Sequence, residues 1–202
     1  MPITAIAFDW GGVFTENTFD ASAVRNLATH AGVPEDDIAK TYFPLMAEFE
    51  AGAFSFDAFT TRFLEASGIK LGDAEFREVF LGSVRDRKEM YDVLASIPAH
   101  YTVGMLSNNV EILCDAVRND PRMARVEHFI FSNEIRVRKP DPLAFAALTD
   151  ALGVPPEETV FIDDHRGNIE ACEALGYRGL WLESYSGFTT NWKTLLPDLP
   201  LP

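Results

Sequence analysis

The first predicted strand and the turn after it read Ile3-Thr4-Ala5-Ile6-Ala7-Phe8-Asp9-Trp10-Gly11-Gly12-Val13. A short apolar run of this kind is typical of a strand buried within a parallel sheet. The two glycines allow a tight turn and a close approach of the backbone to a ligand. Because ligands of open α/β sheets bind at the carboxyl ends of the strands, we expect Asp9 to belong to a functional site.

The composition of the chain limits the classes to which it can belong. With 202 residues, of which 47% are hydrophobic and 24% charged, it is long enough for one core domain with a smaller insertion. No apolar run approaches the length of a membrane span and no basic segment precedes an apolar one, so we expect a cytoplasmic protein with no membrane partner. The two cysteines, Cys114 and Cys172, are expected to be buried, reduced thiols.

The net charge of −14 argues against a nucleic-acid partner, because the phosphates of nucleic acids need a basic surface. The same charge repels anionic substrates at long range, so any phosphate site must be a local positive pocket. The composition does not choose between a monomer and a homodimer.

Residues 15–85 carry apolar side chains at helical spacing and no convincing strand pattern. Four helices are predicted there, with apolar stripes at 24–31, 38–49, 56–63 and 76–80. Aromatic residues in such stripes are more often the core between helices than a cofactor site. We therefore expect a small helical bundle inserted directly after the first strand.

From about residue 86 the pattern changes to an alternation of helices and strands. Such alternation implies a parallel sheet with helices on both faces, and therefore an α/β fold class. The tail from Ser184 onward contains Pro197, Pro200 and Pro202, and we expect it to pack as an irregular end. The strands predicted after the first one are 101–106, 129–131, 159–162 and 179–182.

Polar side chains follow several of the predicted strands at the point where each strand ends. Asp9 follows the first strand, Ser107-Asn108 the second and Asp163-Asp164 a later one, while Arg138-Lys139 precedes a helix. Because the carboxyl ends of parallel strands converge on one edge, we expect these groups to meet. A carboxylate can attack phosphorus, further carboxylates can hold Mg²⁺, and a lysine and a hydroxyl can balance the charge of a transferring phosphoryl group.

These clusters form four motifs that, in this order, resemble those of the haloacid dehalogenase superfamily of hydrolases over nearly the whole chain. Each motif is weak alone, but all four at these spacings are specific. The resemblance implies a Rossmann-like parallel-sheet core, residues 1–14 and 86–202, and a small all-α cap, residues 15–85. A small phosphorylated metabolite would be enclosed between them. The motifs are Phe8-Asp9-Trp10-Gly11-Gly12-Val13, Leu106-Ser107-Asn108, Arg138-Lys139-Pro140-Asp141-Pro142, and Phe161-Ile162-Asp163-Asp164 with Asn168.

The resemblance also implies roles for individual residues. Asp9 matches the nucleophile that forms an aspartyl-phosphate. Ser107 matches the residue that contacts the phosphoryl group, with help from Asn108. Lys139 matches the lysine that pairs with both the nucleophile and the phosphoryl group. The remaining expected substrate contacts are Trp10 and Gly12.

A magnesium site is the cofactor that the resemblance implies. Asp9 and Asp164 match its carboxylate ligands, and Asp163 matches a neighbouring or alternate ligand. The backbone carbonyl of Gly11 matches a further ligand in metal-dependent relatives. Asn168 matches a position that supports the metal site.

The chain departs from the family pattern at Gly11, where typical phosphatases have a second aspartate. That aspartate protonates the leaving oxygen and then activates water, which is worth ~10²–10⁴-fold in rate. One interpretation is a substrate with a better leaving group, such as a sugar anomeric oxygen or an acyl phosphate, since the sequence resembles a branch of sugar-phosphate phosphatases with glycine here. Another is a substitute for the missing acid, either bound water or a cap residue, for which Glu16, Glu48 and Asp57 are the candidates.

Two other functions are compatible with a glycine at this position. A 2-haloacid dehalogenase needs no acid there, because a halide leaves without protonation. Metal-independent dehalogenases lack the pair Asp163-Asp164, however, and these carboxylates would repel Asp9 unless a cation were present. The pair therefore favours magnesium and phosphate. A binding or regulatory protein without turnover is the third possibility, which the joint presence of Asp9, Ser107, Lys139 and Asp164 disfavours.

Overall fold

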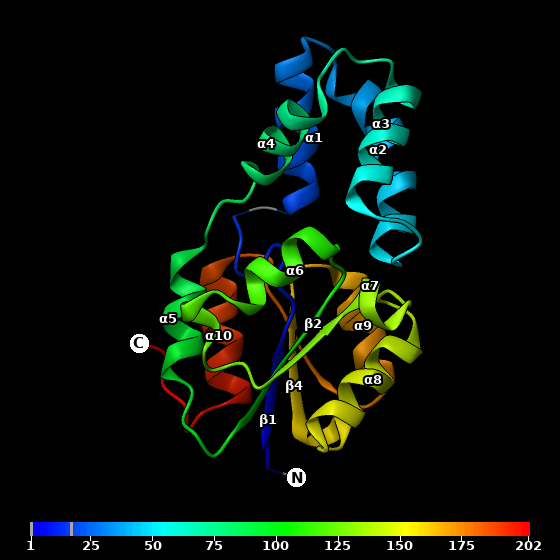
Figure 1. Ribbon diagram of the computed structural model, residues 1–202. Helices are drawn as coiled ribbons and strands as arrows, with labels where there is room; N and C mark the ends of the chain where they lie inside the picture. Colours follow the sequence, from blue (N-terminus) through cyan, green and yellow to red (C-terminus); the bar gives the residue numbers. More distant parts are fainter. Residues whose placement is uncertain (1, 17) are drawn as a thin grey trace.

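A five-stranded parallel sheet forms the centre of the computed structural model, which describes residues 2–16 and 18–202 (Figure 1). The strand order is β3-β2-β1-β4-β5, so β1 lies in the middle with β2 and β4 on either side. This arrangement, with helices on both faces, confirms the predicted α/β fold class. The strands are β1 (Ala5–Phe8), β2 (Thr102–Ser107), β3 (His128–Phe131), β4 (Thr159–Asp163) and β5 (Arg178–Trp181).

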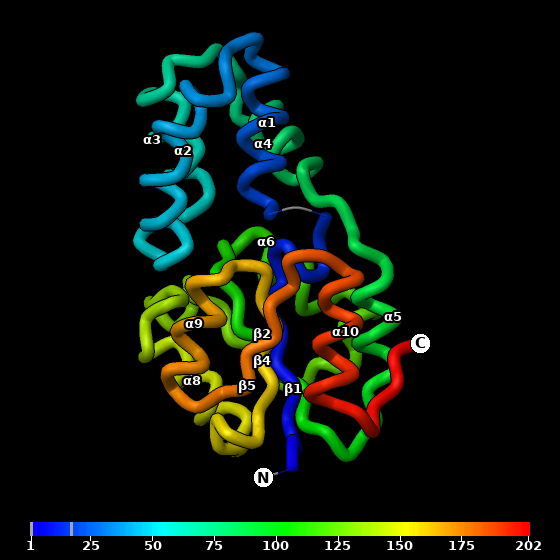
Figure 2. Tube along the Cα trace, turned by 180° about the vertical axis from the view of Figure 1, so that it is seen from behind, coloured from blue at the N-terminus to red at the C-terminus, as the bar shows by residue number. Residues whose placement is uncertain are grey.

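All four residues of β1 are buried, because helices cover both faces of the sheet. Ile6 and Phe8 belong to the apolar cluster on the side of α5 and α10, whereas Ala5 and Ala7 belong to the cluster on the side of α8 and α9. Figure 2 shows these two pairs of helices on opposite sides of the sheet. The helices are α5 (Lys88–Ser96), α8 (Pro142–Leu152), α9 (Arg166–Ala174) and α10 (Tyr185–Leu195).

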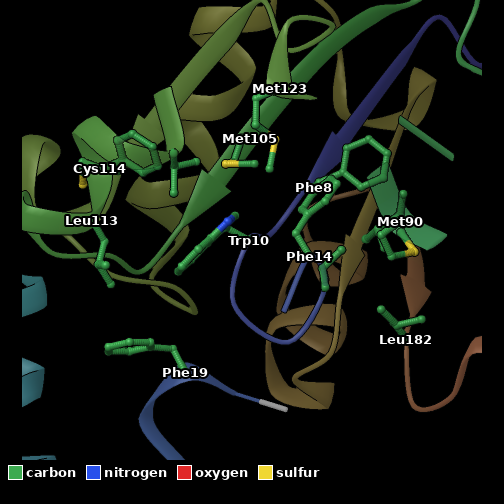
Figure 3. Close-up of a cluster of buried hydrophobic side chains, with 14 of the residues drawn as sticks. Phe8, Trp10, Phe14, Phe19, Met90, Met105, Leu113, Cys114, Met123 and Leu182 are labelled. Atoms are coloured by element: carbon green, nitrogen blue, oxygen red, sulfur yellow. The ribbon is translucent and has the colours of Figure 1, made fainter. Parts of the chain in front are cut away.

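The loop after β1 is fixed by apolar packing at its base. The rings of Phe8 and Phe14 lie 5.5 Å apart between centroids, and that of Phe14 lies 5.1 Å from Tyr91 of α5. Figure 3 shows Phe8, Phe14 and Met90 together, with Trp10 on the other side of the loop. The loop therefore leaves the sheet in one defined direction, which sets the position of Asp9.

Helices α1 to α4, which lie between β1 and α5 in the chain, pack on one another beyond the carboxyl ends of the strands (Figure 1). Thr18 and Ser55 cap two of them by accepting backbone N–H groups of the first turn. Their shared interior is aromatic, with Phe59 in ring contact with both Tyr42 and Phe76. The helices are α1 (Phe19–Ala31), α2 (Glu35–Glu50), α3 (Phe56–Ser67) and α4 (Asp73–Leu81).

The two connections between these helices and the sheet lie side by side. Thr15 and Asp86 form an antiparallel bridge. The N–H of Glu16 donates to the carbonyl of Arg85 at 2.7 Å, and the N–H of Arg87 donates to the carbonyl of Phe14 at 2.8 Å. The chain therefore enters and leaves the helical bundle at a single paired crossing.

Three polar contacts dock the bundle against helices α6 (Glu111–Arg118) and α7 (Ser132–Ile135) and the loop after α7. A carboxylate oxygen of Glu111 accepts from the N–H of Phe56 at 2.8 Å, at the start of α3. The hydroxyl of Ser132 donates to the carbonyl of Glu50 at 2.6 Å, and the Glu50 carboxylate pairs with Arg138 at 2.6 Å. The end of α2 is thus held at the edge of the sheet.

The prediction of an irregular C-terminal end was wrong. Helix α10 covers residues 185–195, and its Phe188 and Trp192 are fully buried. The indole N–H of Trp192 donates to the carbonyl of Leu199 at 2.7 Å, which ties down the segment after the helix. The prolines that suggested irregularity all come after α10, whereas the residues before them have apolar side chains at helical spacing.

None of the helices in the described part of the chain is long and apolar enough to cross a lipid bilayer. The thiols of Cys114 and Cys172 are both buried and unpaired, as the sequence predicts.

If α10 is an integral part of the core, Trp192→Ala should lower the free energy of unfolding by about 3–5 kcal/mol, the usual cost of removing a buried aromatic ring. The exposed neighbour Lys193 offers a matched control, since Lys193→Ala should change stability by less than about 0.5 kcal/mol. Urea unfolding measures both. Equal stability of the two variants would contradict the placement of α10.

Candidate active site

A cavity of about 300 Å³ opens at the carboxyl ends of the central strands, between the sheet and the helical bundle. Asp9, Lys139 and Asp164 line it from the sheet side, while Asp20 and Glu50 line it from α1 and α2. The parallel pairing explains the convergence, because the N–H of Asp9 donates to the carbonyl of Ile162 and so places Asp9 beside the end of β4.

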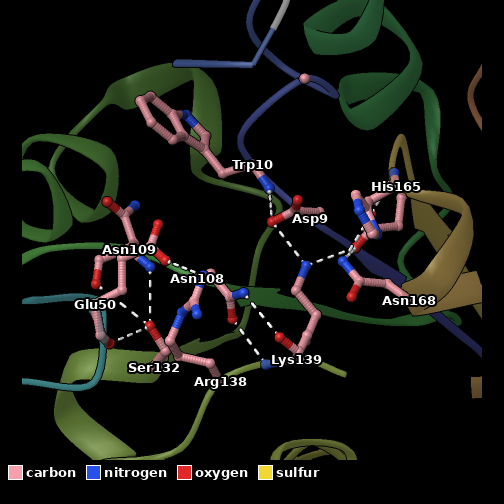
Figure 4. A network of polar contacts seen from close by, with 12 residues as sticks. Asp9, Trp10, Glu50, Asn108, Asn109, Ser132, Arg138, Lys139, His165 and Asn168 are labelled. Atoms are coloured by element: carbon pink, nitrogen blue, oxygen red, sulfur yellow. Dashed lines mark hydrogen bonds and ion pairs between the residues drawn. The ribbon is translucent and has the colours of Figure 1, made fainter. Parts of the chain in front are cut away.

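The carboxylate of Asp9 is held by one oxygen only. Its Oδ1 accepts from the backbone N–H of Trp10 at 2.7 Å and lies 2.9 Å from the Lys139 ammonium. Its Oδ2 has no partner among residues 2–16 and 18–202. Figure 4 shows the contacts of Asp9 with Trp10 and Lys139. Asp9 as a whole is only 8% exposed. The side chain is therefore oriented, with one oxygen left available for attack.

Lys139 is the buried cation of the site. Its Nζ donates to Oδ2 of Asp163 at 2.6 Å, on the opposite side from Asp9. Burial lowers the pKa of Lys139, but the charges of Asp163 and Asp9 outweigh that effect and hold the pKa above its ordinary value. The amide of Asn108 fixes the backbone of Lys139, because it donates to the Lys139 carbonyl at 3.0 Å and accepts from its N–H at 2.8 Å.

Asp163 is fully buried and engaged through both oxygens. Its Oδ1 accepts from the N–H of His165 at 2.8 Å, and the side-chain amide of Asn168 lies 3.0 Å from each oxygen. Together with the contact to Lys139, these bonds leave little of the carboxylate free for another ligand. Asp163 therefore orients the lysine, and Asn168 orients Asp163.

The three aspartates form an acidic cluster that could hold a metal ion. Asp9, Asp163 and Asp164 each offer an oxygen, and these atoms lie within 4.8 Å of one another. Burial raises the pKa of Asp9 to about 7, and the charges of Asp163 and Asp164 add to this effect while Lys139 opposes it. Burial and Asp163 also raise the pKa of Asp164 to about 6. A hard cation such as Mg²⁺ fits this all-oxygen set, since it would favour the ionised carboxylates.

The two glycines after Asp9 have different surroundings. Gly12 has a φ of +72°, and a Cβ atom there would lie 2.0 Å from Oδ2 of Asp164. Only glycine therefore lets the Asp164 carboxylate reach this place, and Gly12, expected to contact substrate, packs against Asp164 instead. Gly11 lines the cavity, and a Cβ atom there would meet nothing within 4 Å.

The three remaining residues expected to contact substrate, Trp10, Ser107 and Asn108, have different surroundings. Trp10 lines the cavity, as expected of a wall residue. The hydroxyl of Ser107 is buried at the end of β2 and has no hydrogen-bond partner in the described part of the chain. A buried hydroxyl without a partner is uncommon, and an oxygen-rich ligand next to it would supply one. The amide of Asn108, by contrast, is already occupied by Lys139.

The structure places none of the three candidate substitute acids at the cavity. Glu16 and Glu48 are exposed, and Asp57 pairs with Arg77 at 3.1 Å on the outer side of the bundle. The carboxylates that do line the cavity from the bundle are Asp20 and Glu50, which the sequence analysis missed.

A signal for these two acids is present in the sequence. Asp20 lies four residues before the buried Val24, and Glu50 lies four residues after the buried Met46. Residues four apart share one face of a helix, so each acid extends an apolar stripe. A carboxylate in that position is either paired or functional.

Comparisons with known proteins agree with this geometry. The profile of the haloacid dehalogenase-like hydrolases matches residues 3–176. The chain therefore belongs to this family of hydrolases, as the four motifs predict.

Individual relatives include both phosphatases and dehalogenases. The chain is 27% identical to phosphatase MT3486 of Mycobacterium tuberculosis over 219 aligned positions, which cover 95% of this chain and 92% of that protein. It is 30% identical over 101 residues to haloacetate dehalogenase H-2 of a Moraxella strain, covering 50% of this chain and only 45% of the dehalogenase. Among solved structures, the magnesium complex of the enzyme BT-2542 of Bacteroides thetaiotaomicron superimposes with a TM-score of 0.77 at 23% identity, over 90% of this chain and 93% of that one.

The packing of Gly12 against Asp164 leads to a test of the acidic cluster. Gly12→Ala should weaken Mg²⁺ binding by about 10–100-fold, the usual effect of disturbing the support of a metal ligand. The added methyl group collides with the Asp164 carboxylate, and the positive φ adds about 1–3 kcal/mol of strain. Gly11→Ala is the control, because it adds the same methyl group in open space. Titration calorimetry with MgCl₂ measures both, and equal affinities would contradict the role of Gly12.

Proposed function

We propose that this hydrolase is a Mg²⁺-dependent phosphatase of a small phosphorylated metabolite, a sugar or acyl phosphate, acting through an aspartyl-phosphate on Asp9. One observation carries the proposal: three carboxylates share a buried site with a single ammonium group. That balance of charge favours a divalent cation and, with it, a phosphoryl group. The alignment with a phosphatase over 95% of the chain supports the same reading.

The proposal assigns the metal to Asp9, Asp164 and the carbonyl of Gly11. When bound there, Mg²⁺ would neutralise charge on the phosphoryl oxygens and hold that group next to Asp9. The contacts of Asp163 favour a supporting role, in which it orients Lys139 rather than acting as a ligand.

The remaining work falls to the side chains of this protein. Oδ2 of Asp9 attacks phosphorus, because it is the oxygen that no residue holds. The Lys139 ammonium, fixed by Asn108 and Asp163, balances the charge that develops on the phosphoryl oxygens. The hydroxyl of Ser107 gains its missing partner from the same oxygens. Asp9 and Lys139 are thus oriented before substrate arrives.

We further propose that residues 15–85 act as a cap over a core formed by residues 1–14 and 86–202. The paired connections at Thr15 and Asp86 and the docking of Glu50 on Ser132 support this division. The cap encloses the site and supplies one wall of the cavity.

A second candidate function is a dehalogenase reaction, which Gly11 and the similarity to haloacetate dehalogenase H-2 favour. In that reaction a carboxylate displaces halide from carbon and no proton is needed by the leaving group. It gives no use for Asp164, whose carboxylate lies in the cluster with Asp9. The phosphatase reaction uses all of these groups, and we rank it first.

The phosphatase proposal predicts phosphate release from small sugar or acyl phosphates only when Mg²⁺ is present. Asp9→Asn should lower that release by on the order of 10⁴-fold or more, because the amide is not a nucleophile. A phosphate assay over a substrate panel, with MgCl₂ or with EDTA, measures both effects. Asn is nearly the same size as Asp, and unchanged thermal unfolding would show that the variant is folded.

The opposite pattern would decide for the second candidate. Chloride release from 2-chloroacids in EDTA, with no phosphate release from any member of the panel, would replace the phosphatase proposal by the dehalogenase one. Silence in both assays would leave a binding protein.

A further inference from the structure

Two acids in the wall of the cavity have no role in the steps above. Asp20 is at the start of α1, and Glu50 is the last residue of α2. Oδ1 of Asp20 accepts from the Tyr42 hydroxyl at 2.8 Å, and Oε2 of Glu50 lies 2.6 Å from a guanidinium nitrogen of Arg138. The second oxygen of each has no partner in residues 2–16 and 18–202. Both acids line the cavity that contains Asp9.

The surroundings of Glu50 favour its protonated form. Burial raises the pKa of Glu50 to about 8; the nearby charges of Asp20 and Asp9 add to this effect, and Arg138 opposes it. Burial also raises the pKa of Asp20, while the hydrogen bond from Tyr42 and the charge of Arg138 lower it. The buried Glu50 and the half-buried Asp20 resist ionising together, so the pair retains a proton at neutral pH.

We propose that Glu50 is the proton donor to the leaving oxygen, in place of the acid that Gly11 removes, and that Asp20 is a positioning residue that keeps Glu50 protonated. The inference rests on the proposed phosphatase function. It stands on the location of Glu50, which lines the same cavity as Asp9 but from the bundle side, across from Lys139 and Asp164. The charge of Asp9 acts on Glu50 across that cavity.

The docking of α2 keeps Glu50 in this place. Its carbonyl accepts from Ser132, and its carboxylate pairs with Arg138, the residue next to Lys139 in the chain (Figure 4). Arg136 packs against Gly52, where a Cβ atom would lie 2.8 Å from its guanidinium group. The acid and the lysine of the phosphoryl site are thus held by one short segment, residues 136–139. Glu50 reaches the site only with the bundle docked.

The proton balance of both half-reactions then closes. In the first, Oδ2 of Asp9 bonds to phosphorus, and the bond from phosphorus to the leaving oxygen breaks. Its electron pair takes the proton of Glu50, and the alcohol departs. In the second, the Glu50 carboxylate takes a proton from water, whose oxygen bonds to phosphorus. The bond to Asp9 breaks with its electrons returning to the carboxylate, phosphate is released and Glu50 is again protonated.

Glu50→Gln tests the proposal through the leaving group. A proton donor matters for an alkyl phosphate, whose alkoxide leaves poorly, and hardly at all for acetyl phosphate. We expect kcat/KM for glycerol phosphate to fall by ~10²–10⁴-fold and that for acetyl phosphate to change by less than about threefold. Gln can still hydrogen-bond Arg138, and Glu48→Gln, an exposed change on the same helix, is the matched control that should leave both values unchanged.

Other outcomes would overturn the inference. Equal losses for both substrates would assign Glu50 to substrate binding, and no loss for glycerol phosphate would show that it does not donate the proton. In either case, Mg²⁺-dependent release that requires Asp9 would leave the phosphatase function standing. Wild-type activity on acetyl phosphate with none on glycerol phosphate would overturn the inference alone, whereas no phosphate release from any member of the substrate panel would remove both proposals.

The role of Asp20 is tested by the pH profile. Asp20→Asn removes the negative charge that raises the pKa of Glu50, while the charges of Arg138 and Asp9 and the hydroxyl of Tyr42 stay in place. The alkaline limb of kcat/KM for glycerol phosphate should therefore move to lower pH, with little change at pH 6. An unmoved limb would contradict the role of Asp20.

A rescue experiment tests the same inference through a gain of phosphatase activity. Gly11→Asp restores a carboxylate at the usual position, where the cavity has room for it. Combined with Glu50→Gln, it should recover at least tenfold of the lost activity on glycerol phosphate, and Gly11→Asn should recover none. Recovery by both substitutions, or by neither, would count against a missing proton donor.

Stability offers a readout independent of activity. The pKa of Glu50 in the folded protein, about 8, lies above its ordinary value of 4.5. Between these values the folded state binds more protons than the unfolded state, so stability falls as pH rises. Glu50→Gln removes this contribution, and its thermal midpoint should fall less than that of the wild type from pH 5 to pH 8. Parallel curves would contradict a proton held on Glu50.

Discussion

The buried ammonium group of Lys139 is the interaction on which the rest of the site depends. It lies between Asp9 and Asp163, and burying any of these three charges without an opposite charge beside it would cost several kcal/mol. The surrounding bonds keep it there: Asn108 fixes its backbone, and Asn168 fixes the carboxylate that it faces. The sheet brings Asp9, Asn108 and Asp163 together, because they lie at the ends of the neighbouring parallel strands β1, β2 and β4. Three carboxylates around one ammonium group leave a net negative charge, which favours the binding of a cation.

Much of this arrangement is predictable from local sequence. The apolar run before Asp9 predicts β1, and the strands on either side of it, β2 and β4, end at Ser107-Asn108 and Asp163-Asp164. Strand patterns and parallel topology are enough to bring Asp9, Lys139 and Asp164 to one edge. The use of each group is harder to predict. Asn108, expected to hold phosphate, is occupied by the Lys139 backbone, and Gly12, expected to touch substrate, makes room for Asp164.

The contribution of the bundle is less predictable because it depends on tertiary packing. Asp20 and Glu50 are thirty positions apart and form no motif, and only the packing of α1 on α2 and of α2 on α7 brings them to the cavity. Nearness to Asp9 in the sequence is a poor guide to which acids line the cavity, since Glu16 is exposed and lies outside it. The sequence does not predict the C-terminal helix for another reason. The three prolines at 197, 200 and 202 suggest irregular structure for the whole tail, although residues 185–195 before them have the apolar spacing of an amphipathic helix.

The bridge between Thr15 and Asp86 has an evolutionary consequence. The segment between these residues starts and ends at the same point beside the sheet. Its length therefore has little effect on the geometry of the strands that it connects. The entropy of closing a loop grows only slowly with its length, so the sheet tolerates insertions of different size at this point. The sequence between these two residues can then change in length and composition, while the strands that carry Asp9 and Asp164 remain as they are.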